Sequence, residues 1–160
     1  MMKTAMQCRV MILMLAAAFA AAAQKYDGPK PPKPDLPYLK HADNLVATEA
    51  VSAAQSDKKD ETIYTIEGAN SSARTPLAEP IFLLEADKLV PEHIQLVRLE
   101  SKNGHRELTV SKKKPIHALR LNVTHITGKL YRLEADEELE PGEYSLSPSD
   151  SNQAFCFQVY

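Results

Sequence analysis

The chain has 160 residues, of which 44% are apolar and 25% charged, and its formal net charge is −2. That length suffices for one modest domain and is too short for two ordinary ones. The apolar fraction and the presence of only five glycines exclude a disordered or collagen-like chain, and the slightly acidic balance offers no basic excess for nucleic acid.

Residues 1–23 have the three-part layout of a secretory signal peptide. Lys3 and Arg9 precede an apolar run, and small residues offer cleavage after Ala20 or Ala23. The apolar run is short for a membrane-spanning helix, although a retained anchor stays open as the alternative. We therefore expect an exported protein, periplasmic or extracellular, with no integral membrane span after signal removal and a net charge of −4 on the remainder.

Removal of the signal would also remove Cys8 and leave Cys156 as the only cysteine. No internal disulfide is then available, so in an exported protein this thiol is either buried or paired between chains. Its neighbours Phe155 and Phe157 favour burial.

Residues 24–40 contain five of the eleven prolines, interleaved with lysines. Proline fixes φ and removes a backbone donor, so this stretch is predicted to be an extended polyproline II linker that acts as a tether. The alternative is a docking motif for an aromatic-lined groove.

Residues 41–60 allow two interpretations. Leu45, Val46 and Ala50 recur at helical spacing, which predicts a short helix ending near Gln55. Because its apolar side is mostly alanine, an extended segment is the alternative. A charged surface loop is expected at residues 56–60.

From residue 61 onward, short apolar runs separated by turn residues predict an antiparallel β-domain over residues 61–160. No long amphipathic helix separates the runs, so a two-sheet sandwich fits better than an α/β fold. The predicted strands are Thr62–Ile66, Pro80–Ala86, Ile94–Ser101, Arg106–Val110, His117–Ile126, Leu130–Ala135, Glu143–Ser147 and Ala154–Tyr160.

Alternation within the strands assigns their faces. Leu119, Leu121 and Val123 alternate with polar residues, which predicts one buried face. The run from Ile81 to Leu84 is apolar on both sides and predicts a central strand. Between Ile94 and Leu99 the apolar phase switches, which indicates either a β-bulge or burial of both sides.

Two turns carry the strongest local signals. Asn103 and Gly104 readily adopt the positive φ values of a type I′ hairpin turn. The Leu139–Tyr144 stretch, with Pro141 and Gly142, resembles the turn before the penultimate strand of immunoglobulin-like and fibronectin-like domains. That resemblance implies an immunoglobulin-like sandwich in which the Tyr144 hydroxyl bonds to upstream backbone near residues 138–140 and forms a tyrosine corner.

A broader resemblance rests on the segments 34–39, 75–80 and 142–160. They are similar to short exported bacterial proteins of acidobacterial type that have no assigned function. The resemblance implies a bacterial, exported setting, and it transfers no active-site residue.

The sequence contains no convergent catalytic or metal-binding pattern. The histidines (His41, His93, His105, His117 and His125) lack metal-ligand spacing, and Cys156 is poorly placed for nucleophilic attack. The acidic run 134–140 is expected to be a solvated face, without an aromatic floor for a sugar. Lys112–Lys114 is interpreted as a solubilising loop or edge guard, with an anionic partner as the alternative.

We therefore assign no catalytic, cofactor-binding or metal-ligating residue and expect no cofactor. The leading hypothesis is a non-enzymatic β-sandwich module that binds a protein or glycan partner in the cell envelope. The alternatives are a hydrolase with a loop-built site that uses His93, His105 or Cys156, and a carrier of a small ligand.

Overall fold

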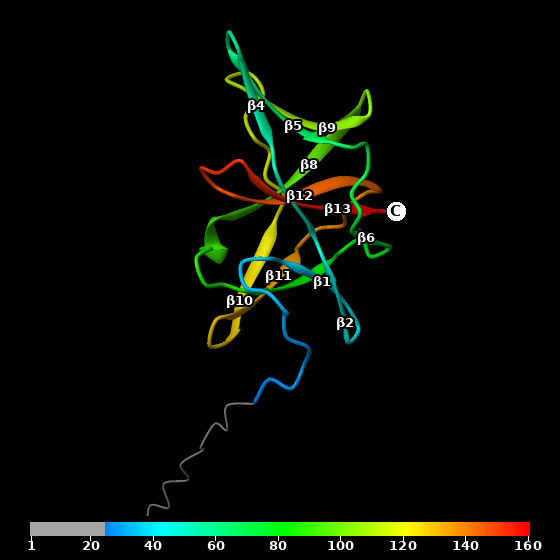
Figure 1. Cartoon of the computed structure of the whole chain (residues 1–160), viewed down its shortest axis with the longest axis vertical. Helices are drawn as coiled ribbons and strands as arrows, with labels where there is room; N and C mark the ends of the chain where they lie inside the picture. The colour runs from blue at the N-terminus through cyan, green and yellow to red at the C-terminus, as the bar shows by residue number, and fades with distance from the viewer. Residues whose placement is uncertain (1–24) are drawn as a thin grey trace, which may run out of the picture.

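The computed structural model describes residues 25–160, and the predicted signal peptide lies outside these residues. The described chain is mainly β and forms two sheets, as the sequence predicts. One short 3₁₀ turn, η1 (Pro91–His93), precedes β8. In Figure 1, β4, β5 and β9 lie at one end of the molecule, β12 and β13 in the middle, and β1, β2, β10 and β11 toward the other end.

The first sheet has five antiparallel strands. Their order is β10 (Leu121–Thr127), β11 (Leu130–Ala135), β7 (Ile81–Glu85), β1 (Tyr38–His41) and β2 (Asn44–Ala47). β7 lies at the centre of this sheet with Phe82, Leu83 and Leu84 all buried, which confirms the central strand predicted there.

The second sheet is larger and curled. Its order is β3 (Glu49–Ser52), β13 (Gln153–Val159), β12 (Gly142–Pro148), β8 (Ile94–Lys102), β9 (His105–Ser111), β5 (Glu61–Glu67) and β4 (Ala54–Lys58), with β6 (Arg74–Thr75) pairing parallel to β13. The two end strands, β3 and β4, are consecutive in the chain and separated by Ala53 alone. The sheet therefore curls into a half-barrel whose ends meet at this buried residue.

The main core lies between the sheets. Phe82 of β7 meets Phe157 of β13 edge-on, with ring centroids 4.9 Å apart. Leu39, Leu96 and Leu146 are buried in the same cluster. A second, smaller cluster containing Val97, Leu99 and Cys156 lies inside the half-barrel.

These two cores explain the change of apolar phase in β8. Leu96 belongs to the core between the sheets, whereas Val97 and Leu99 belong to the core inside the half-barrel. The pairing of β8 with β12 runs without a register shift from Leu99 to Ile94. Of the two interpretations, burial of both sides is therefore correct, and the β-bulge is not present at this position.

The short helix predicted between residues 41 and 60 is wrong. The segment forms β2, β3 and β4, the extended alternative, and the predicted charged loop shrinks to a tight turn at Lys59 and Asp60. Alanine favours a helix in isolation, but pairing of β3 with β13 and of β4 with β5 satisfies this backbone in strands instead.

The folded part also begins earlier than the predicted linker boundary at residue 40. Tyr38 and Leu39 are buried in β1, and Pro31 is buried as well. The Asp35 carboxylate accepts hydrogen bonds from three successive backbone amides, at residues 87 to 89. The second half of the predicted linker is therefore part of the folded domain.

Both predicted turns form. Asn103 and Gly104 have φ values of 52° and 82° and join β8 to β9, whose last pair is Lys102 with His105. Tyr144 is buried, and its hydroxyl donates to the Glu140 carbonyl oxygen at 2.7 Å. The Arg98 guanidinium covers Gly142 and donates to the Pro141 carbonyl at 3.3 Å.

We expect Tyr144→Phe to lower the free energy of unfolding by about 1 kcal/mol, because the variant loses one hydrogen bond while the ring remains stacked on Phe157. Urea denaturation would measure the loss. Tyr160→Phe is the matched control, since Tyr160 is exposed. Equal midpoints for the wild type and Tyr144→Phe would contradict a stabilising role of this bond.

Candidate functional site

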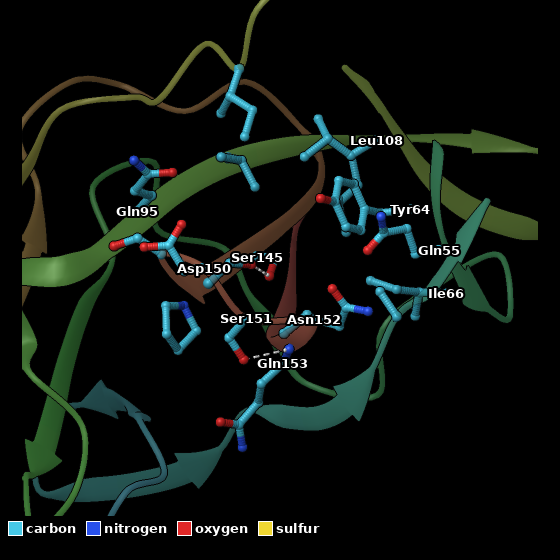
Figure 2. Close-up of a pocket in the computed structure, with 18 residues that line it drawn as sticks. Gln55, Tyr64, Ile66, Gln95, Leu108, Ser145, Asp150, Ser151, Asn152 and Gln153 are labelled. Carbon is cyan, nitrogen blue, oxygen red and sulfur yellow. Dashed lines mark hydrogen bonds between the residues drawn. The ribbon is translucent and has the colours of Figure 1, made fainter. Parts of the chain in front are cut away.

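The interior of the half-barrel, hereafter the lumen, is a pocket of about 440 Å³ (Figure 2). Strands β4, β5, β8, β9, β12 and β13 and the loop between β12 and β13 all contribute to its wall. The lining residues are Ala53, Gln55, Tyr64, Ile66, Gln95, Val97, Leu99, Leu108, Ile116, Ser145, Ser147, Pro148, Ser149, Asp150, Ser151, Asn152, Gln153 and Ala154.

Small side chains on the inner face leave this space unfilled. Ser145 of β12 pairs directly with Val97 of β8 and with Cys156 of β13, so all three side chains point to the same face. Ala53 and Ala154 line the same interior. In barrels of this size the interior is ordinarily filled by side chains, so this run of small residues opens a cavity where larger ones would close it.

One end of the inner face is occupied by a cluster of buried charges. The Arg106 side chain is fully buried and forms a bidentate ion pair with Glu49, at 2.8 and 3.0 Å. Its Nε also donates to the Gly68 carbonyl oxygen at 2.9 Å, and its Nη2 to the Glu67 carbonyl oxygen at 2.8 Å. Arg106 pairs with Ile66, a lining residue, and shares the inner face of β9 with Leu108.

Glu143 is the third charged residue of this cluster, and its carboxylate has fewer hydrogen-bond partners than that of Glu49. One of its carboxylate oxygens accepts the Ser71 amide at 3.0 Å and lies 3.9 Å from Arg106, while the other is buried without a partner in the described part of the chain. Burial raises the pKa of Glu143 above its ordinary value. Burial also acts to raise the pKa of Glu49, but the hydrogen bonds from Arg106 and Ser71 together with the Arg106 charge hold that pKa below the ordinary value.

Polar side chains also line the lumen itself, away from the Arg106 cluster. Figure 2 shows Gln95 and Asp150 across the pocket from Tyr64 and Gln55, with Ser151 and Asn152 between them. The loop that carries Asp150 to Asn152 is anchored at both ends, because the Ser149 hydroxyl donates to the His93 carbonyl at 2.8 Å and the Ala53 amide donates to the Asn152 carbonyl at 2.8 Å. The lining of the lumen thus combines hydroxyl, amide and carboxylate groups with apolar side chains.

Cys156 belongs to the apolar cluster inside the half-barrel and is not among the residues that line the lumen. Its thiol is fully buried, in agreement with the favoured interpretation from the sequence. Burial raises the pKa of this thiol to about 12, so it stays protonated and unreactive at neutral pH.

This thiol makes stability depend on pH in the alkaline range. An unfolded cysteine ionises at about pH 8.5, whereas the buried thiol keeps its proton up to a pH of about 12. Between these two values the folded chain therefore binds one more proton than the unfolded chain. We expect the free energy of unfolding of the wild type to fall relative to Cys156→Ala by about 1.4 kcal/mol per pH unit above roughly pH 9. Denaturation of both proteins across this range would measure it, and parallel pH profiles would contradict the buried, protonated thiol.

The residues named for the hydrolase alternative are not brought together at the lumen. His93 lies in η1, His105 contacts Glu107 at 3.2 Å on β9, and neither lines the pocket. Of the remaining histidines, His41 contacts the Thr75 hydroxyl and His125 the Gly128 carbonyl. Among residues 25–160, no group of three or more metal-ligating side chains converges.

Sequence reasoning missed the main constituents of the site. Tyr64 supplies an aromatic side chain to the lumen, and it lies in a predicted strand without any distinguishing motif. The Arg106 cluster joins β3, β9 and β12, which are far apart in the sequence. The only sequence signal was an arginine on the same strand face as Leu108.

The described residues contain no helix long and apolar enough to cross a bilayer. Comparisons with family models, with curated proteins and with solved structures found no match to this chain.

Proposed function

We propose that this protein is an exported, non-enzymatic binding module whose lumen holds a short, uncharged segment of a glycan in the cell envelope. The observation that carries the proposal is the chemistry of the lumen. A pocket of about 440 Å³ presents hydroxyl and amide side chains together with Tyr64 and aliphatic side chains.

These two kinds of side chain match the two kinds of surface on a sugar ring. Sugar hydroxyls are both donors and acceptors, and so are the hydroxyls of Ser147 and Ser151 and, through separate atoms, the amides of Asn152 and Gln95. The C–H face of a sugar is apolar and packs against an aromatic or aliphatic wall such as Tyr64, Leu108 and Val97. Small-molecule sites generally combine a mostly apolar wall with a few placed polar groups.

Two further features support binding without turnover. Asp150 is the only charged side chain in the lining, and it is exposed. The buried thiol of Cys156 has a pKa of about 12 and lies outside the lining. Export is supported by the signal-like layout of residues 1–23 and by the resemblance to short exported bacterial proteins.

The test is isothermal titration of the protein with neutral oligosaccharides such as chitotriose, cellotriose and maltotriose. We expect one of these to bind, and Tyr64→Ala to weaken that binding about tenfold, equivalent to about 1.4 kcal/mol. Tyr160→Ala is the matched control, because Tyr160 is an exposed tyrosine outside the lumen. Equal affinities of wild type and Tyr64→Ala would contradict a glycan site at Tyr64.

A second candidate is a carrier of a small apolar ligand, which the aliphatic wall of the lumen favours. A thermal shift distinguishes the two, since a ligand at 100 times its Kd adds about 2.7 kcal/mol to stability. A shift with lauric acid and none with oligosaccharides would support the carrier and overturn the glycan proposal.

A further inference from the structure

Two lysine pairs from distant parts of the sequence meet around one groove, hereafter the lysine groove. It has a volume of about 580 Å³ and shares no lining residue with the lumen. Its lining residues are Lys58, Lys59, Asp60, Glu61, Ser111, Lys112 and Lys113.

Strand pairing brings these residues together. Lys58 ends β4 and pairs with Glu61, the first residue of β5, across the tight turn at Lys59 and Asp60. Glu61 in turn pairs with Ser111, the last residue of β9, and Lys112 follows directly. The sequence shows two separate lysine-containing loops, and the sheet register places them side by side.

The four ammonium groups of the groove are not neutralised by local ion pairs. In the range 25–160, the lysines that do pair are Lys102, Lys114 and Lys129, whereas Lys58, Lys59, Lys112 and Lys113 form no ion pair. Lys114, the next residue, forms an ion pair with Glu100 at 2.9 Å and does not line the groove. The groove therefore concentrates positive charge on a chain whose net charge beyond residue 23 is −4.

The shape and the charge together select the class of ligand. Each ammonium offers three donors and no acceptor, so the four lysines suit a group that is rich in acceptor oxygens. Asp60 and Glu61 offset part of the charge and disfavour a large, diffuse anion in contact with the whole groove. A groove lined by one lysine pair from each of two loops fits a compact group that contacts both pairs.

We propose that the lysine groove is a binding site for a compact phosphate-type anion, with a diphosphate preferred over a single phosphate. The preference follows from the two lysine pairs, because each phosphate of a diphosphate can meet one pair. Inorganic pyrophosphate and orthophosphate are the probes, and they report on the groove independently of any glycan in the lumen.

The test is titration calorimetry of the full chain with both anions at low ionic strength. Pyrophosphate is expected to bind about tenfold more tightly than orthophosphate, and Lys→Gln at positions 58, 59, 112 and 113 together is expected to weaken pyrophosphate binding at least about tenfold. Lys→Gln at the exposed positions 25, 30, 33 and 88 removes the same net charge elsewhere and is the matched control.

A gain of affinity provides the sharpest check. Asp60→Asn combined with Glu61→Gln removes the opposing charges and should strengthen pyrophosphate binding, an effect that a purely structural role of these exposed residues would not produce. Added salt should weaken binding, since the Debye length falls to about 3 Å at 1 M. Equal losses in the groove variant and the control, or unchanged binding in the groove variant, would overturn the proposal. Binding to vesicles containing anionic lipid without binding of pyrophosphate would also overturn it.

Discussion

Replacing Arg106 with methionine is expected to lower the free energy of unfolding by about 3 to 5 kcal/mol. The guanidinium is fully buried, forms a bidentate ion pair with Glu49, donates to the carbonyl oxygens of Glu67 and Gly68 and lies 3.9 Å from Glu143. Methionine fills much of the same volume, so the loss reports chiefly on charge and hydrogen bonding. Without Arg106, the carboxylates of Glu49 and Glu143 remain beside each other with no cation between them.

Chemical denaturation measures this loss, and Arg98→Met is the matched control. Arg98 also pairs with a glutamate, Glu140 at 2.9 Å, but both side chains are largely exposed. The control should therefore lose no more than about 1 kcal/mol from its ion pair. Adding Glu143→Gln to Arg106→Met should recover part of the loss by removing one unpaired charge. If Arg106→Met costs no more than Arg98→Met, the buried cluster does not stabilise the half-barrel.

The second large effect is expected at Phe157. Phe157→Ala should lower the free energy of unfolding by about 3 to 5 kcal/mol, because it opens a cavity at the centre of the core between the two sheets. The ring is fully buried, meets Phe82 of the opposite sheet and stacks on Tyr144 with centroids 5.6 Å apart.

Thermal and urea denaturation would measure the Phe157 effect against Tyr160→Ala, the exposed aromatic residue at the end of the chain. Surface substitutions of this kind generally change stability by no more than about 0.5 kcal/mol. A similarly small loss for Phe157→Ala would mean that the two sheets do not pack as described.

Local sequence patterns were sufficient for most of the β-domain. Alternation and turn residues predicted strands that correspond to β5 and to β7 through β13, although β10 begins only at Leu121. The hairpin at Asn103 and the bond of Tyr144 were also predictable, because each depends on residues close together in the chain.

The strands between residues 38 and 58 were not predictable by the same reasoning. β4 is exposed along its whole length, and β2 is mostly exposed, so neither shows the alternation that marks a half-buried strand. Their alanines raise helix propensity, whereas pairing with β1, β5 and β13 decides the outcome. The pairing of β3 with β13 joins segments that are far apart in the sequence, so local sequence patterns do not reveal it.

The candidate sites depended on such long-range pairing even more strongly. Glu49, Arg106 and Glu143 come from three strands, and no local motif connects them. Lys112 and Lys113 were noticed as part of a basic loop, but only the register of β4, β5 and β9 brings Lys58 and Lys59 to them.

We propose that the lumen of the half-barrel binds a neutral glycan. The most direct test of this proposal is titration of the isotopically labelled protein with the oligosaccharide that binds best, followed by amide chemical shifts in NMR spectra. We predict that the shifted amides cluster around the lumen, at Ala53, Tyr64, Asn152 and Ala154, while those of β10 and β11 stay unchanged. Shifts confined to the five-stranded sheet, or no shifts at millimolar oligosaccharide, would contradict the claim.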